Sequence, residues 1–385
     1  MRQNRFLPIA ALSILFASCQ KDIRDSMNEE SAERSSISEQ ASEKGQAVGV
    51  VYTLSNQVSA NEVLAYSRDV SGHLTFMKAY AAGGTGTGGG LGSQGAVILS
   101  SGGGWLIAVN AGSNSVSSFK VSGNGLQLTS TVSSGGTKPI SVTEYNNIVF
   151  VLNAGGSGNI SGFNLDDDGN LSVIANSTRQ LSNSSADPAQ ISFTDDGHAV
   201  VVTEKANNKI ITYTINAQGM PGSMHSIASA TPTPFGFAVG QNGYIYVSEA
   251  AGGAPGASVV SSYHVSADGT ITLVDGSVSA GQTAACWVVI TNNDKYVYAT
   301  NTGSGNISSF KNQSGDLMVL NAVAAPTGSG SAPIDAALSN NSKFLYTLNS
   351  GIKTISAFAV ANDGSLSNIQ TVTGLPDGAT GLAAK

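Results

Sequence analysis

Two glutamates, Glu204 and Glu249, each end a short apolar run at a point where similar segments of the chain carry Asn or Ser. A carboxylate can act as a general base that takes a proton from an attacking water. A cation or hydrogen-bond donor nearby can stabilise the oxyanion that forms when water adds to a carbonyl group. The other candidate residues, which we expect to bind a ligand near the two glutamates, are Lys138, Arg179, Lys205, Asp187, Gln190, Asn153, Asn301 and Asp335.

A purely structural role is the alternative interpretation of both glutamates. Each carboxylate would then accept hydrogen bonds from loop amides, as the Asn residues at equivalent positions would. The four histidines do not complete an acid–base site, because His73, His198 and His264 are expected on outer turns or third strands and His225 near a fourth strand. Acid–base catalysis and a structural role therefore both stay open.

The elements that must position these residues follow from an internal repeat. Seven apolar runs end on small polar or acidic residues, which we call the anchors, and successive anchors are 43 to 55 residues apart. The anchors are Ser55, Asn110, Asn153, Glu204, Glu249, Asn301 and Asn349. A repeat of this length is typical of one four-stranded blade of a β-propeller. Seven repeats predict a seven-bladed ring.

One repeat shows the four strands, which we name A to D from the innermost outwards. Residues 148–153 form a continuous apolar run that predicts a buried strand B, and residues 159–165 alternate as a half-buried strand C does. The turn at Asp168-Gly169 leads into strand D at residues 171–173. Residues 188–193 are then strand A of the next blade, and an insertion at residues 252–256 lengthens the B-to-C loop of the fifth blade.

The two ends of the repeat region complement each other. The first repeat has strands B, C and D but nothing before them to serve as strand A, whereas residues 379–383 form a surplus strand at the end of the chain. Pairing the two would close the ring and remove its open sheet edges. We therefore predict an all-β fold in which residues 48–385 form a closed seven-bladed β-propeller of four antiparallel strands per blade.

The composition agrees with a single ring that has a polar but weakly charged surface. Charged residues make up 11% of the chain, Gly supplies 46 of 385 residues, and the net charge is −7. An acidic chain of this kind has no electrostatic footprint for nucleic acid. The run Gly84–Gly89 is interpreted as a surface loop, and Asp166–Asp168 as a turn rather than a calcium site. We expect a monomer without cofactor or metal.

The first 47 residues differ from the rest of the chain. Two arginines precede an apolar run at residues 6–16, and small residues lead to Cys19, so residues 1–19 resemble a bacterial lipoprotein signal with lipid attached to Cys19. A simple signal peptide with an incidental cysteine is the alternative. Residues 20–47 contain no aromatic residue and are expected to form a disordered tether. The ring would then be held in the bacterial cell envelope, facing the periplasm or the exterior.

The repeat motif carries a family resemblance. Residues 110–119, Asn-Ala-Gly-Ser-Asn-Ser-Val-Ser-Ser-Phe, and the following Gly-Leu-Gln-Leu at 125–128 resemble the repeats of the seven-bladed β-propeller lactonase family. That family includes 6-phosphogluconolactonase-like proteins and the carboxymuconate lactonizing enzyme. The resemblance implies a site of glutamate, arginine and histidine, in which Glu249 matches the family's glutamate after a Tyr-x-Tyr-Val strand. The chain departs from the family at the start of strand A, where it has Pro188-Ala189-Gln190 and Pro234-Phe235-Gly236.

Three functions are compatible with these observations. The first is hydrolysis of an unphosphorylated sugar-acid lactone or a related lactone, because an exported protein would not meet a phosphorylated cytosolic metabolite. The second is a non-catalytic ring that binds a glycan or peptide ligand. The third is a scaffolding surface protein.

Overall fold

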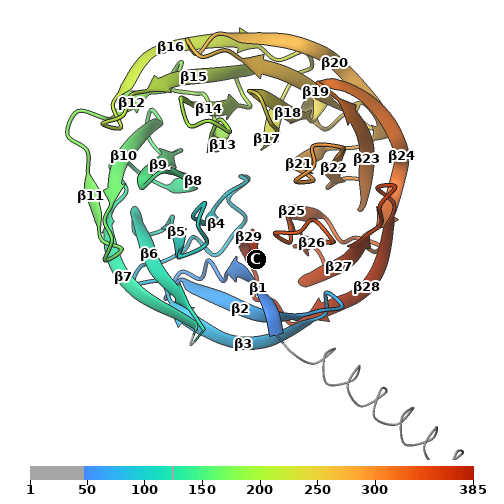
Figure 1. The fold of residues 1–385 in the computed structure, drawn as a ribbon, viewed down its shortest axis with the longest axis horizontal. Coiled ribbons are helices and arrows are strands. Elements are labelled where there is room, and N and C mark those ends of the chain that lie inside the picture. Colours follow the sequence, from blue (N-terminus) through green and yellow to red (C-terminus); the bar gives the residue numbers. More distant parts are fainter. Residues whose placement is uncertain (1–46, 124) are drawn as a thin grey trace, which may run out of the picture. The chain divides into compact units, whose positions relative to one another are not determined.

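The computed structural model describes residues 47–123 and 125–385, which fold into seven antiparallel sheets arranged as a ring (Figure 1). The signal segment, Cys19 and residues 20–46 of the predicted tether lie outside the described residues, and Ala47 already belongs to the first strand. Each sheet is one blade, and its strands succeed one another from the centre outwards. This arrangement confirms the predicted all-β, seven-bladed propeller.

The blades share the order A, B, C, D. The first three contain β29 (Thr380–Ala384), β1 (Ala47–Leu54), β2 (Glu62–Asp69) and β3 (Leu74–Ala81); β4 (Val97–Leu99), β5 (Trp105–Asn110), β6 (Ser115–Ser122) and β7 (Gly125–Ser133); and β8 (Pro139–Tyr145), β9 (Ile148–Asn153), β10 (Asn159–Leu165), β11 (Leu171–Val173) and β12 (Arg179–Gln180). The next two contain β13 (Pro188–Phe193), β14 (Ala199–Glu204), β15 (Lys209–Ile215) and β16 (Pro221–Ala228); and β17 (Pro234–Val239), β18 (Tyr244–Glu249), β19 (Ser258–Val265) and β20 (Ile271–Gln282). The last two contain β21 (Ala285–Ile290), β22 (Tyr296–Asn301), β23 (Asn306–Gln313) and β24 (Asp316–Pro326); and β25 (Pro333–Leu338), β26 (Phe344–Asn349), β27 (Thr354–Val360) and β28 (Leu366–Thr373).

The insertion of the fifth blade lies between β18 and β19, as predicted, and includes the short 3-10 helix η1 (Ala251–Gly253). In the third blade, strand D is split into β11 and β12, which both pair with β10.

The C-terminal strand closes the ring. Strand β29 pairs with β1 through Tyr52 and Ala383, one residue further along the chain than the predicted strand. The Lys385 amide donates to the Val50 carbonyl at 2.8 Å, and the Arg68 guanidinium donates to the Lys385 main-chain oxygen at 3.1 and 3.2 Å. The first blade is therefore built from both ends of the described chain.

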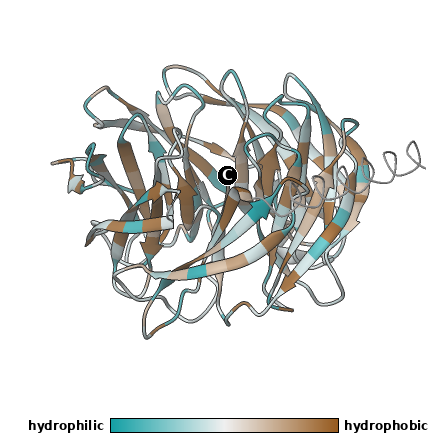
Figure 2. Ribbon diagram, turned by 60° about the horizontal axis from the view of Figure 1, so that its bottom comes forward, coloured by the Kyte–Doolittle hydropathy of each residue, from teal (hydrophilic) through white to brown (hydrophobic). Residues whose placement is uncertain are grey.

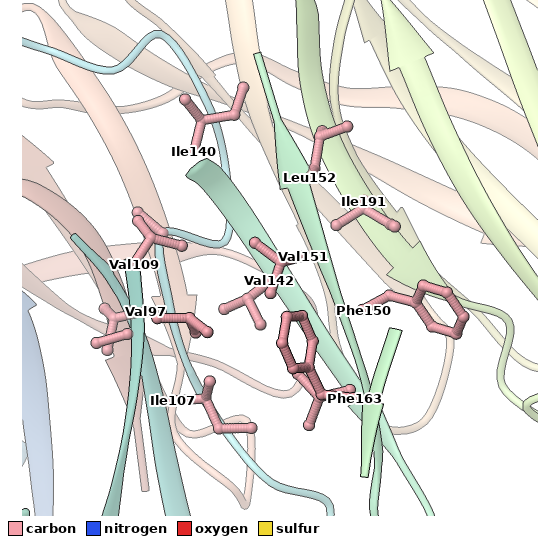
Figure 3. Packing of buried hydrophobic residues seen from close by; sticks show 14 of the residues in the cluster. Val97, Ile107, Val109, Ile140, Val142, Phe150, Val151, Leu152, Phe163 and Ile191 are labelled. Carbon is pink, nitrogen blue, oxygen red and sulfur yellow. The ribbon is translucent and has the colours of Figure 1, made fainter. Parts of the chain in front are cut away.

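Apolar side chains fill the space between neighbouring blades. Figure 3 shows Ile107 and Val109 of β5 facing Val142 of β8, with Phe163 of β10 beside them, and Phe150 of β9 on the other face of the same blade, near Ile191 of β13. In Figure 2 the strands are mostly brown and the connecting loops mostly teal or pale, as expected when apolar runs form buried strands. Burial of both faces of the inner strands of each blade thus holds the ring together.

Tyrosine hydroxyls add hydrogen bonds between blades, and one pair of residues provides a test. The Tyr298 hydroxyl donates to the Gly364 carbonyl of the next blade at 2.8 Å in a buried position, whereas the Tyr296 hydroxyl donates to the Asn362 carbonyl at an exposed one. Tyr298→Phe leaves a buried carbonyl without its partner and should lower the free energy of unfolding by about 1 kcal/mol. In urea unfolding, Tyr296→Phe should lower the free energy of unfolding by less than about 0.5 kcal/mol, because water replaces the hydroxyl. Equal losses would contradict this account.

Candidate functional site

The two faces of the ring differ in the connections they carry. We call upper the face of the B-to-C and D-to-A loops, and lower the face of the A-to-B and C-to-D turns. All seven anchors end strand B at or next to the upper face. This is where the candidate residues were expected to meet.

Glu204 is fully buried and holds the loop that precedes its own blade. The Ser182 amide donates to Glu204 Oε1 at 2.9 Å, and the Ser182 hydroxyl donates to Oε2. The Asn207 side-chain amide also donates to Oε2, at 2.9 Å. Both oxygens of this carboxylate are therefore engaged by the protein itself.

Glu249 has the same kind of surroundings in the fifth blade and is also fully buried. The amides of Ala230 and Thr231 donate to Oε1 and Oε2 at 3.1 and 2.9 Å. The Tyr263 hydroxyl donates to Oε1 at 2.5 Å and the Ser261 hydroxyl to Oε2 at 2.8 Å. Burial raises the pKa of Glu249, although these four donors oppose the shift.

The anchors of other blades make equivalent contacts. Asn110 donates to the Ser117 hydroxyl at 2.8 Å, and the same contact joins Asn301 to Ser308 and Asn349 to Ser356. Asn153 instead donates to the Ser134 carbonyl and to the Asn159 side chain. Glu249 contacts its strand-C serine, Ser261, in the same way across the insertion, but here the serine hydroxyl is the donor. The geometry of both glutamates thus corresponds to the structural alternative.

Lys205 lies on the upper face beside the central channel. Its ammonium group donates to the carbonyls of Gly92 and Pro188 at 2.9 and 3.3 Å and lies 3.5 Å from Asp187 Oδ1. The same group sits 4.8 Å from the centre of the Phe235 ring. Burial lowers the pKa of Lys205, and the negative charge of Asp187 opposes the shift. The structure therefore brings Lys205 and Asp187 together.

Lys138 is exposed, and its positive charge also lowers the pKa of Lys205. It lies in the loop before β8, where its amide donates to Asn114 Oδ1 at 2.8 Å. Among the predicted site residues, Lys205 therefore interacts electrostatically with Asp187 and Lys138.

The loop between β3 and β4 fills the upper end of the channel. Its residue Gln94 forms two hydrogen bonds with the backbone of Val288 on the opposite side of the ring, at 2.8 and 3.1 Å. The Trp287 indole donates to the Ser93 carbonyl at 3.0 Å, and the Ser93 hydroxyl donates to the Ile140 carbonyl at 2.7 Å. In Figure 1 this segment projects from β4 toward the centre of the ring. We call residues 91–95 the plug.

Two predicted binding residues, Arg179 and Gln190, form hydrogen bonds with the backbone of the protein. The Arg179 guanidinium donates to the carbonyls of Asn176, Thr178 and Pro221 at the outer strands. The side-chain amide of Gln190 exchanges two hydrogen bonds with the backbone of Phe237, at 3.0 and 2.7 Å, and joins β13 to β17. Arg179 therefore lies apart from the channel, and Gln190 lies at its wall.

Asp335 borders a cavity of about 340 Å³ inside the channel. The cavity lies between β4, β8, β13, β25 and β29, and it extends to Ser100 and Asn340 at the lower ends of their strands. Asp335 is 1% exposed, and its Oδ1 accepts from the Ala336 amide at 2.8 Å. Its Oδ2 has no hydrogen-bond partner within the described part of the chain. Burial raises the pKa of Asp335 well above its ordinary value, although the backbone amides of Ala336 and Leu382 oppose the shift.

This raised pKa predicts a pH dependence of stability. Above about pH 4 the unfolded chain releases the Asp335 proton while the folded chain keeps it, so the stability contributed by this group is lost as pH rises. Asp335→Asn removes the titration. We expect urea unfolding at about pH 4.5 and about pH 7.5 to show that the free energy of unfolding of the variant, relative to that of the unmodified protein, increases as pH rises. A difference that is the same at both pH values would contradict the shift.

Sequence reasoning missed the residues that close the channel, namely Gln94, Trp287 and Phe235. The rings of Phe235 and Trp287 lie 4.9 Å apart, next to the buried thiol of Cys286. Burial raises the pKa of Cys286 to about 11, so the thiol is not reactive at neutral pH. The signal for these residues in the sequence was an aromatic side chain near the start of two strands A, Phe235 in β17 and Trp287 in β21.

Several kinds of site are missing from residues 47–123 and 125–385. No three side chains of His, Cys, Asp or Glu gather there as metal ligands. The described helix, η1, is three residues long, and nothing helical in this part of the chain could cross a membrane.

Seven four-stranded blades around a channel define the chain as a seven-bladed β-propeller. The family described as the lactonases with a seven-bladed β-propeller matches residues 227–337 and 287–384. Over these repeats the chain matches the lactonase family that its motifs resemble, which confirms that resemblance. No curated protein has a significant sequence match to the chain.

Solved structures show the same fold at low sequence identity. A Lactobacillus plantarum protein superposes with a TM-score of 0.71 and 14% identity, covering 88% of this chain and 100% of its own. A candidate 6-phosphogluconolactonase of Bacteroides uniformis has a TM-score of 0.67 and 18% identity, covering 86% and 98%. The periplasmic gluconolactonase of Pseudomonas aeruginosa has a TM-score of 0.65 and 15% identity, with the same coverage. These similarities concern the fold.

Proposed function

We propose that this protein is an exported, lipid-anchored ring that binds a sugar-acid lactone or a closely related carbohydrate, without acid–base catalysis by Glu204 or Glu249. The lactonase-family match supports the ligand class. The observation that carries the proposal is that all four carboxylate oxygens of the two glutamates already accept hydrogen bonds from their own blades.

Lactone hydrolysis is the second candidate, and one specific contact favours it. Lys205 and Asp187 lie 3.5 Å apart near the channel, and Asp187 is exposed to solvent. In this scheme Asp187 takes a proton from water while Lys205 stabilises the oxyanion. Lys205 would have to leave the carbonyls of Gly92 and Pro188 to do so, which is why binding is the preferred function.

A lactone assay separates the two candidates. D-glucono-1,5-lactone would be followed with a pH indicator, and its spontaneous opening would be subtracted. Binding alone predicts that the lactone opens no faster than this background. It also predicts that titration calorimetry with the lactone releases or absorbs heat. Hydrolysis predicts turnover that Lys205→Met or Asp187→Asn abolishes. Turnover lost on Glu249→Gln, in protein shown to be folded, would overturn the structural role of Glu249.

Lipid anchoring through Cys19 has its own test. A lipid attached to Cys19 should hold the protein in the membrane fraction of the cells that produce it. Cys19→Ser should release most of the protein into the soluble fraction and abolish labelling by radioactive palmitate. Membrane association and labelling that both persist in the variant would contradict the anchor.

A further inference from the structure

The central channel is closed at its upper end and extends toward the lower face. The plug closes the upper end with hydrogen bonds to three different inner strands: Gln94 bonds to Val288 of β21 and accepts from Ser141 of β8, and the Gln94 amide donates to Ala189 of β13. Below the plug, the cavity reaches the residues that end the inner strands at the lower face. We therefore expect a molecule to enter this cavity from the lower face.

Asp335 gives this cavity an unmet hydrogen-bonding group. Its carboxyl is almost wholly buried, and Oδ2 makes no hydrogen bond of good geometry among the described residues, although the Leu382 amide lies near enough to lower the pKa of this carboxyl. The other long polar side chains at the upper wall, Gln94 and Gln190, are satisfied by backbone groups. A buried polar atom without a partner is costly, and a ligand that pairs with it removes this cost.

The lining of the cavity indicates the chemistry of its ligand. The lining combines hydroxyl and amide side chains, including Ser100, Thr143, Ser192 and Asn340, with apolar residues of β4, β8, β13 and β29. Asp335 is the titratable residue among those that line it, and no Lys, Arg or His is among them. Such a wall suits a neutral molecule with many hydroxyl groups and offers an anion no counter-charge. A volume of about 340 Å³ is in the range of small-molecule sites.

We propose that the channel is a binding site for a neutral, hydroxyl-rich molecule of monosaccharide size, reached from the lower face, with the Asp335 carboxyl as its hydrogen-bond partner. A sugar lactone in its closed form meets this description, and the choice of a lactone rests on the proposed function. The open sugar acid, which is an anion at neutral pH, is excluded by the same wall.

Two tryptophan substitutions in the seventh blade test the direction of access. Asn340 lies at the lower end of β25 and is exposed, whereas Ser350 is exposed at the upper end of β26. Titration calorimetry with D-glucono-1,5-lactone, freshly dissolved, and with D-gluconate should show binding of the lactone and none of gluconate. Asn340→Trp should weaken lactone binding at least tenfold, and Ser350→Trp should leave it unchanged. Asp335→Ala should weaken it similarly, with Asp335→Asn, which retains a donor, affected less.

The possible results are distinct. Loss of binding in Asn340→Trp with binding kept in Ser350→Trp supports the channel site. Binding kept in Asn340→Trp, or lost in Ser350→Trp, overturns the site while leaving the proposed function intact. Tighter binding of gluconate than of the lactone overturns the neutral ligand class. No binding of either probe by the unmodified protein overturns both the proposed function and the ligand assigned to the channel.

Discussion

Removal of residues 376–385 should abolish the cooperative folding of the ring. The truncated protein loses β29, and with it the pairing of Tyr52 with Ala383 and the contact of Arg68 with the Lys385 oxygen. It also exposes the apolar side chains of the first and seventh blades that form one buried cluster with Leu382. A native protein is stable by only about 5–15 kcal/mol, so the loss of an inner strand is expected to exceed the whole margin.

Circular dichroism during heating measures this effect. The full ring should show one cooperative transition, and the truncated protein should aggregate or unfold without one. A synthetic peptide of residues 376–385 added in excess is the control, because it should restore part of the transition by pairing with β1. A truncated protein with an unchanged melting curve would refute closure by the C-terminal strand.

Glu249→Ala should destabilise the ring strongly. It leaves the amides of Ala230 and Thr231 and the hydroxyls of Ser261 and Tyr263 without their acceptor in a buried position. Breaking one side of a buried charged network costs about 3–5 kcal/mol. Glu249→Gln keeps the shape and one acceptor oxygen, and should cost less.

Denaturant unfolding of the two Glu249 variants gives the measurement. Asp167→Ala, which removes an exposed carboxylate at a turn, is the control and should change stability by less than about 0.5 kcal/mol. A loss below about 1 kcal/mol for Glu249→Ala would show that the network contributes little, and would return Glu249 to the list of catalytic candidates.

The strands could be predicted from the sequence because the ring is made of short apolar segments bounded by turns. In the third blade the predicted strands 148–153, 159–165 and 171–173 coincide with β9, β10 and β11. The closure could be predicted because one repeat lacked strand A and the end of the chain supplied it. These features are local patterns, or differences between repeats, and need no knowledge of side-chain packing.

The site could be predicted only in part. Lys205 and Asp187 do interact, but the direction of the Glu204 and Glu249 side chains depends on the fold of the D-to-A loops, which no periodic pattern encodes. The plug was missed for a related reason. A glycine-rich stretch is typical of surface loops, and only the tertiary structure shows that Gln94 reaches Val288 across the ring.

The most direct test is a crystal structure of the protein grown with D-glucono-1,5-lactone. The account predicts ligand density in the channel below Gln94, within hydrogen-bond distance of Asp335, with Glu204 and Glu249 still bonded to Ser182 and Thr231. Density on the upper face, in contact with Glu249 or Glu204 and with their loop contacts broken, would contradict it.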